Sequence, residues 1–104
     1  MKFVNCTPHA IKLNNGDVFQ PSGIIPRVSS EMSEFDDNMI CRQSFGNVTG
    51  LPQPVADTIF IVSAMVLAAV WRNDVVAPAT GHPETKRNEK GHIISVPGFV
   101  VIGR

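Results

Sequence analysis

The sequence predicts an α+β fold, a small β-rich domain in which about six or seven short, mostly antiparallel strands surround one central apolar helix. Three observations support this prediction. Short runs of alternating apolar and polar residues recur along the chain, separated by turn formers such as Pro, Gly and Asn. Residues 64–71 are rich in Ala, Leu and Met, which favour helix. The chain has 104 residues, of which 43% are hydrophobic and 17% charged, so we expect a single domain over residues 1–104.

The first half of the chain is expected to form strands and hairpins. Residues 1–7 alternate as a short strand, and residues 10–20 form a hairpin whose turn is the Asn-Asn-Gly-Asp sequence at 14–17. Residues 24–32 and 39–45 are two further strands, which a solvated acidic loop joins into a second hairpin. Antiparallel pairing between sequence neighbours therefore accounts for this half.

A buried strand followed by a helix is expected near the middle of the chain. Residues 58–62 are β-branched and aromatic, which is typical of a buried strand. Ser63 is placed to cap the N-terminus of a helix over residues 64–71. Because this helix is apolar nearly all round, we expect either a sheet wrapped around it or burial in an oligomer.

The remainder of the chain is expected to be a long loop between extended segments. Residues 75–77 form a short strand or an extended segment. Residues 78–91 are dense in Pro, Gly and charge, which predicts an exposed loop. Residues 92–102 form a strand pair, or one strand that is interrupted at a Pro-Gly step.

Charge and cysteine content argue against several classes of protein. Nine basic residues balance nine acidic ones, so no direct DNA binding or attraction to an anionic membrane is expected. Cys6 and Cys41 form no C-x-x-C pair, and the three histidines lack zinc-ligand spacing, so no metal and no other cofactor is expected. No signal sequence is evident, which predicts free thiols in a reducing cytoplasm. The apolar run 59–71 is shorter than a membrane-spanning helix requires.

The strongest candidate for a binding site follows the predicted helix. Arg72 and Asp74 could simply form a local salt bridge. Alternatively, Arg72 could grip a phosphate or carboxylate with its planar guanidinium, while Asp74 orients the ligand. Thr80, in the Pro-Ala-Thr-Gly turn, would then donate its hydroxyl to the same ligand.

Two further residues are candidates for secondary contacts with an anionic ligand. His9, after Thr-Pro, is either a structural turn residue or a ligand contact. Arg27 and Arg42 lie on neighbouring predicted strands. They would either pair with Glu31 or Glu34 at the surface or converge on one face as a positive patch. Ser63 resembles a nucleophile only by its strand-to-helix position, because the G-x-S-x-G context is missing.

Several motifs occur together along the chain. They are N-x-T-P-H at 5–9, P-S-G at 21–23, G-L-P-x-P at 50–54, I-V-S at 61–63, R-x-D-V-V-A-P-x-T-G at 72–81 and G-x-I-x-x-V at 91–96. This combination resembles a family of small proteins that bacteriophage and prophage genomes encode. The resemblance implies an accessory protein that acts in the host cytoplasm, and it carries no catalytic assignment.

Three functions are therefore considered. The first is a non-enzymatic, homo-oligomeric protein that sequesters a small anionic ligand, such as a nucleotide-derived immune signal, and so counters host defence. The second is a protein-interaction module without a ligand, a host-factor inhibitor or virion component, which an exposed apolar surface within residues 96–102 would favour. The third is a small hydrolase or transferase that uses His9 with Asp57 or Asp74, which requires these side chains to meet in a cleft.

Overall fold

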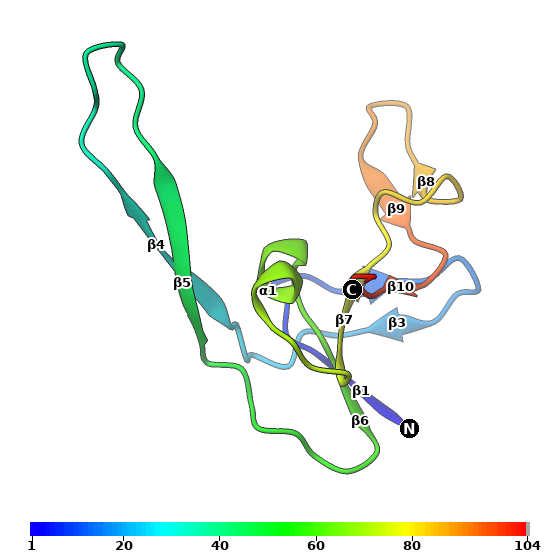
Figure 1. Ribbon diagram of the computed structural model, residues 1–104. Helices are drawn as coiled ribbons and strands as arrows, with labels where there is room; N and C mark the ends of the chain where they lie inside the picture. Colours follow the sequence, from blue (N-terminus) through cyan, green and yellow to red (C-terminus); the bar gives the residue numbers. More distant parts are fainter. Residues whose placement is uncertain (104) are drawn as a thin grey trace.

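The computed structural model describes residues 1–103, which form ten strands and one short helix (Figure 1). The strand-rich α+β class is confirmed. The strands outnumber those predicted because four of them have only two residues each. In chain order the elements are β1 (Lys2–Asn5), β2 (Ile11–Lys12), β3 (Val18–Phe19), β4 (Arg27–Met32), β5 (Gln43–Thr49), β6 (Thr58–Ile61), α1 (Ala64–Ala69), β7 (Val75–Pro78), β8 (Lys86–Arg87), β9 (Ile93–Ser95) and β10 (Phe99–Val100).

The largest sheet has four strands in the order β1-β6-β7-β10. β1 is parallel to β6 and β6 is parallel to β7, whereas β10 is antiparallel to β7. Residues 62–74, which include α1, carry the chain from the end of β6 back to the start of β7, as a parallel pair requires. Antiparallel pairing holds in the three two-stranded sheets. Four of the six strand pairs within residues 1–103 are therefore antiparallel, in line with the predicted, mostly antiparallel arrangement, whereas the parallel pairing of β1, β6 and β7 was not predicted.

The helix lies against one face of this sheet instead of at its centre. Ser63 is the N-cap, as predicted, and its hydroxyl accepts a hydrogen bond from the Val66 amide. The helix ends at Ala69, two residues earlier than expected, because Val70 is already extended. Only Val66 and Leu67 are buried, so the remainder of this apolar helix is not covered by the sheet.

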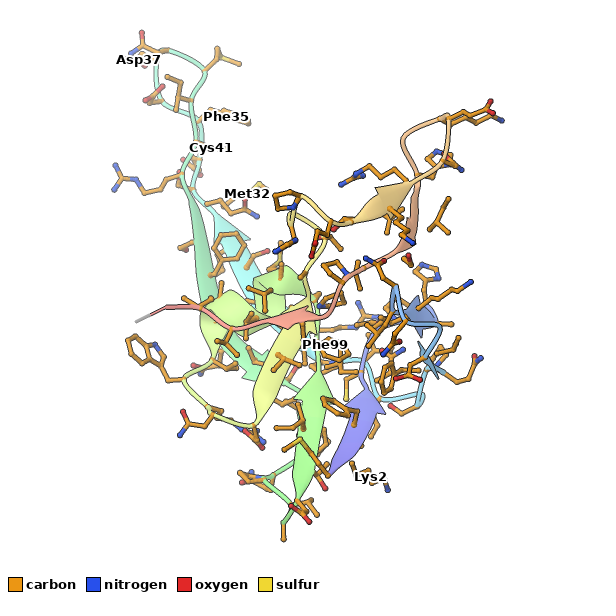
Figure 2. All side chains as sticks on the ribbon, turned by 90° about the vertical axis from the view of Figure 1, so that its right-hand side faces the viewer. Lys2, Met32, Phe35, Asp37, Cys41 and Phe99 are labelled. Carbon is orange, nitrogen blue, oxygen red and sulfur yellow. The ribbon has the colours of Figure 1, made fainter. Side chains whose placement is uncertain are left out.

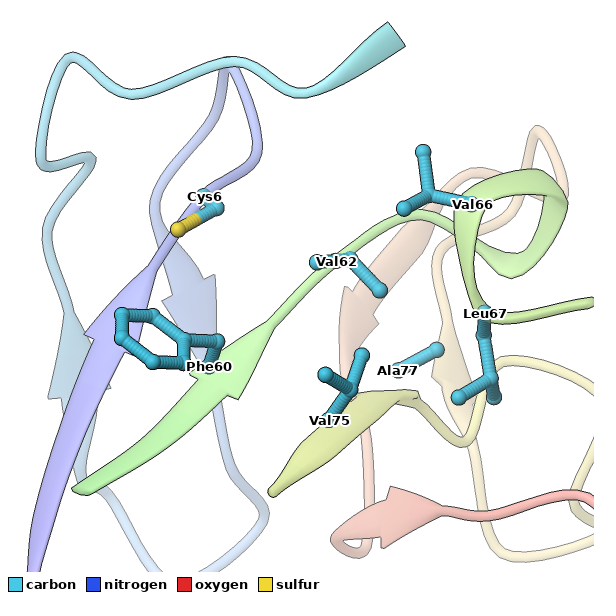
Figure 3. Close-up of a cluster of buried hydrophobic side chains, with 7 residues drawn as sticks. All are labelled: Cys6, Phe60, Val62, Val66, Leu67, Val75 and Ala77. Carbon is cyan, nitrogen blue, oxygen red and sulfur yellow. The ribbon is translucent and has the colours of Figure 1, made fainter. Parts of the chain in front are cut away.

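Side chains of β6 alternate between two hydrophobic clusters, one on each face of the sheet. On the helix side, Phe60 and Val62 pack with residues of β7 and α1 (Figure 3). The Cys6 thiol belongs to this cluster, and its burial raises the pKa of the thiol. Cys6 and Cys41 are both free thiols within residues 1–103. The complete helix-side cluster is Cys6, Phe60, Val62, Val66, Leu67, Val75 and Ala77.

The second cluster is covered by the β2–β3 hairpin. Ile61 is completely buried there between Ile11 and Val96. Three phenylalanine rings, Phe3, Phe19 and Phe99, close the edge of this cluster with ring centroids 5.3–5.6 Å apart. The hairpin predicted over residues 10–20 is therefore confirmed, and it covers half of the core.

The second predicted hairpin forms a long arm, which we define as residues 27–49 and which comprises β4, β5 and the turn between them. Its second strand occupies 43–49, not the predicted 39–45, because Asp36 organises residues 36–40 into a turn. The Asp36 carboxylate accepts hydrogen bonds from the amides of Asn38 and Ile40. The arm extends away from the remainder of the molecule (Figure 1).

The C-terminal third forms more strand structure than predicted. The expected loop over residues 78–91 contains β8, which pairs with β9. The strand pair expected within 92–102 does not form, because β9 pairs with β8 while β10 pairs with β7. Within residues 1–103, no helix has the length and apolar character needed to cross a membrane.

Candidate functional site

A pocket of about 480 Å³ lies where the three parallel strands end. Thr7 and His9 follow β1, Ser63 and Ala64 follow β6, and Thr80 follows β7, and all five line this pocket. Parallel strands direct their carboxyl ends to one edge of a sheet, and this edge is where open α/β sheets commonly bind ligands. We call this cavity the strand-end pocket.

The opposite wall of the strand-end pocket is mostly apolar. It is formed by β2, through Ile11 and Lys12, and by β9, through Ile93 and Ile94. Ile93 and Ile94 are 43% and 51% exposed, so they present apolar surface that the protein itself does not cover. A ligand with a flat or apolar portion could pack against this wall while its polar portion contacts the strand ends.

The N-x-T-P-H motif builds one rim of this pocket through a buried asparagine. Asn5 is 2% exposed and uses both ends of its amide. Its Nδ2 donates to the carbonyls of His9 and Phe19, at 2.9 Å each. Its Oδ1 accepts from the Thr7 amide at 2.9 Å and from the Thr7 hydroxyl at 2.6 Å. Asn5 therefore fixes the loop that carries His9 and joins it to β3.

The polar side chains of the strand-end pocket differ in how they are engaged. Ser63 caps α1, and the Ser95 hydroxyl donates to Asn14 Oδ1 at 2.6 Å. Among residues 1–103, by contrast, no side-chain hydrogen bond or ion pair is formed by His9, Lys12 or Thr80. These three side chains are exposed, and they could bind a ligand without breaking a contact within the protein.

Arg72 and Asp74 form a two-point ion pair with each other. Arg72 Nε donates to Asp74 Oδ1 at 2.9 Å, and a terminal nitrogen donates to Asp74 Oδ2 at 2.6 Å. The other terminal nitrogen donates to the Pro52 carbonyl at 2.8 Å, and the guanidinium lies 5.8 Å from the centre of the Phe60 ring. The hydrogen bonds from Arg72 hold the pKa of Asp74 below its ordinary value.

This geometry matches the salt-bridge alternative for Arg72 and Asp74. The guanidinium connects the loop before β6 to the loop before β7, so an anion would have to compete with Asp74 for it. Arg72 also borders a second pocket of about 420 Å³, which we call the apolar groove. It is lined by Leu67, Val70, Trp71, Arg72, Asn73, Val75, Val101 and Ile102.

The five residues predicted to bind a ligand occupy three places. His9 and Thr80 both line the strand-end pocket, although 71 positions separate them in the sequence. Arg72 and Asp74 are joined beside the apolar groove. Arg27 is exposed at the base of the arm, opposite Thr49, and lines neither pocket.

The acid–base pairs considered for a hydrolase or transferase are not formed. His9 lies beyond the carboxyl end of β1, whereas Asp57 and Asp74 precede the amino ends of β6 and β7. Because these strands are parallel, the histidine and both carboxylates lie at opposite edges of the sheet. Residues 1–103 also contain no group of three or more His, Cys, Asp or Glu side chains that could hold a metal ion.

Sequence reasoning missed Asn5 and Lys12. Asn5 is the first residue of the N-x-T-P-H motif, where an amide side chain before a Thr-Pro turn indicates a local turn contact, but its burial follows only from the fold. Lys12 is the polar position in the alternating segment that begins the first hairpin. Its role at the pocket depends on β2 lying across the strand ends, which the local pattern does not reveal.

Comparisons of the chain with protein-family models, with curated proteins and with solved structures found no match. The resemblance to phage-encoded proteins therefore stays a prediction from the motifs.

Proposed function

We propose that this protein binds a small anionic organic ligand in the strand-end pocket and sequesters it. A nucleotide-derived immune signal is the ligand class that we favour, and the protein would act as a homo-oligomeric phage accessory protein in the host cytoplasm. The observation that carries the proposal is a set of three side chains that line this pocket and form no side-chain hydrogen bond or ion pair within residues 1–103. His9 and Thr80 follow the parallel strands β1 and β7, and Lys12 lies on β2 in the opposite wall.

The two walls of the pocket suit the two parts of a nucleotide. Lys12 offers a positive charge, and Thr80 offers a hydroxyl donor, for a phosphate group. The exposed faces of Ile93 and Ile94 offer apolar surface for a base. A cavity of about 480 Å³ falls within the usual range for small-molecule sites.

Arg72 and Asp74 support the site indirectly in this proposal. Their ion pair fixes the amino end of β7, and β7 in turn delivers Thr80 to the pocket. The predicted grip of Arg72 on the ligand is thus replaced by contacts from His9 and Lys12.

Calorimetric titration against linear and cyclic nucleotides tests this proposal. We expect at least one compound to bind, and we expect Lys12→Ala to weaken its binding at least about tenfold, the loss of one charge-assisted contact. Lys2→Ala is the matched control, since Lys2 is an exposed lysine at the opposite end of β1. Failure of every compound to bind, or equal binding by Lys12→Ala, would refute the proposal.

A protein-interaction module is the second candidate, because the chain exposes apolar side chains near its C-terminal end. Within the segment 96–102, Val101 is 61% exposed and Val100 and Ile102 are more than 40% exposed, whereas Val96 is buried. Co-purification of a host protein from infected cells that is lost with Val101→Ser, together with an empty nucleotide screen, would favour this function over ligand sequestration.

A further inference from the structure

The protein exposes more surface than a compact monomeric domain of this size normally carries. The accessible surface is 7440 Å², whereas a compact 11.3 kDa protein exposes roughly 5,700 Å². The radius of gyration is 16.0 Å, compared with about 13 Å for a compact chain of this length. The excess of roughly 1,700 Å² is about twice the area that one partner buries in a standard interface.

The arm exposes several large apolar side chains beyond its base. Figure 2 shows Met32, Phe35 and Cys41 on the arm, away from the body of the protein. Near its base, Val28 and Val48 pack against the helix-side cluster, so the arm is anchored there. Beyond that point the large apolar side chains are 55–74% exposed, and they are Met32, Phe35, Met39, Ile40 and Phe45.

A complementary surface exists on the same chain, in the apolar groove. It lies between α1 and the C-terminal segment, where Trp71 is 81% exposed and Val101 is 61% exposed. Figures 1 and 2 both show the tip of the arm extending away from α1 and the C-terminal segment, so the arm does not cover the groove of its own chain.

Charge also favours pairing between the arm and the body of another copy. The arm carries four acidic residues and two basic residues, which gives it a formal charge of −2. The whole chain has a net charge of zero, so the remainder carries +2. The arm and the remainder of the chain thus carry net charges of opposite sign, which disfavours contact between two arms and favours contact of an arm with the remainder of another copy. The charged residues of the arm are Arg27, Glu31, Glu34, Asp36, Asp37 and Arg42.

We propose that the arm of one chain docks in the apolar groove of a second copy of the same chain. Each chain then gives one arm and receives another, which accounts for an excess surface equal to two interface faces. If two chains each place their arm in the groove of the other, they form a two-fold dimer. If each chain places its arm in the groove of the next, the chains close a ring. The arm–groove contact is the same in both assemblies. The arm–groove contact would be the subunit interface of the homo-oligomer in the proposed function. This contact requires no ligand in the strand-end pocket.

Light scattering after size-exclusion chromatography is the first test. We expect the wild type to be larger than a monomer, and we expect Phe35→Ser combined with Met39→Ser to raise the dissociation constant at least about tenfold. Val55→Ser is the matched control, because Val55 is 57% exposed but lies outside both the arm and the groove. A monomeric wild type, or an arm variant that assembles as the wild type does, would overturn the proposal.

Thiol cross-linking locates the contact. Cys41 lies on the arm, whereas Cys6 is 2% exposed and shielded from reagent. The wild type is mixed with a Val101→Cys, Cys41→Ser chain and treated with a short bismaleimide. We expect a covalent dimer that requires both thiols and that is lost when Val55→Cys replaces Val101→Cys. Its absence in an assembled sample would exclude the groove as the docking site.

A variant of the groove distinguishes docking from misfolding. Val101→Ser lies outside both core clusters, so its melting temperature should match that of the wild type. We expect it to dissociate as the arm variant does. Because no nucleotide enters these experiments, their outcome is independent of the titration that tests the strand-end pocket.

Discussion

Removal of the Arg72 guanidinium tests whether the Arg72–Asp74 pair is structural. In Arg72→Ala, three hydrogen bonds at 2.6–2.9 Å to Asp74 and Pro52 are lost together. Bonds to charged groups contribute about 1.5–3 kcal/mol each when one partner is removed. Both side chains keep about a fifth of their surface exposed, so solvent replaces part of this loss. We therefore expect the free energy of unfolding to fall by about 2–3 kcal/mol in total.

Urea unfolding of a double-mutant cycle provides the assay. Arg72→Ala, Asp74→Ala and the double variant should give a coupling energy of about 1–2 kcal/mol, because the two-point geometry is lost in each single variant. Arg72→Lys should recover less than half of the stability, since an ammonium cannot form both parallel bonds. In a domain of this size, a loss of about 2 kcal/mol lowers the melting temperature by roughly 8–10 °C.

Two results would refute a structural role for the pair. One is a coupling energy below about 0.3 kcal/mol, which is within the range of independent sites. The other is unchanged stability of Arg72→Ala together with complete loss of nucleotide binding. The second result would restore Arg72 as the direct ligand contact that the sequence predicted.

Asn5→Ala should lower the free energy of unfolding by about 3 kcal/mol, because it leaves the backbone partners of a buried amide unpaired. Urea titration measures this loss. A loss below about 1 kcal/mol would show that these backbone groups are hydrated in the variant. Ile61→Ala should lower the free energy of unfolding by about 3–4 kcal/mol, because Ile61 is completely buried. Met65→Ala, at an exposed position, should lower it by less than about 1 kcal/mol. Equal losses in the two variants would contradict the assignment of Ile61 to the core. The stability that Asp74 contributes should be present above its ordinary pKa of 3.8 and be lost as the pH falls through its lowered pKa. The difference in melting temperature between the wild type and Asp74→Asn should thus be present at about pH 6 and shrink below about pH 4, and a constant difference would contradict the linkage.

Local features of the fold were predictable from the sequence, and long-range pairing was not. The Asn-Asn-Gly-Asp turn and the Ser63 cap depend on neighbouring residues, and both formed as expected. The pairing of β1 with β6 joins segments more than 50 residues apart, and nothing local distinguishes it from pairing with a neighbouring hairpin. The short helix was expected at the centre because its sequence is apolar, but its six residues can bury only one side.

In the candidate site, too, local contacts could be predicted from the sequence and long-range contacts could not. A salt bridge was one of two alternatives for Arg72 and Asp74, and it forms because two residues separated by one position can meet without help from the fold. Their predicted contact with a ligand stays a prediction. His9 and Thr80 were selected individually, and only the parallel order of β1, β6 and β7 brings them to one pocket. Lys12 was missed because it reaches the pocket through a hairpin that lies across the strand ends.

A crystal structure of the protein with the tightest-binding nucleotide is the most direct test of the proposed function. We predict ligand density in the strand-end pocket, with a phosphate oxygen about 3 Å from Lys12 Nζ or Thr80 Oγ1 and the base against Ile93 or Ile94. The Arg72–Asp74 bonds should be unchanged in the complex. Ligand density beside Arg72, with Asp74 displaced and the strand-end pocket empty, would show instead that ligand binding takes place at the ion pair.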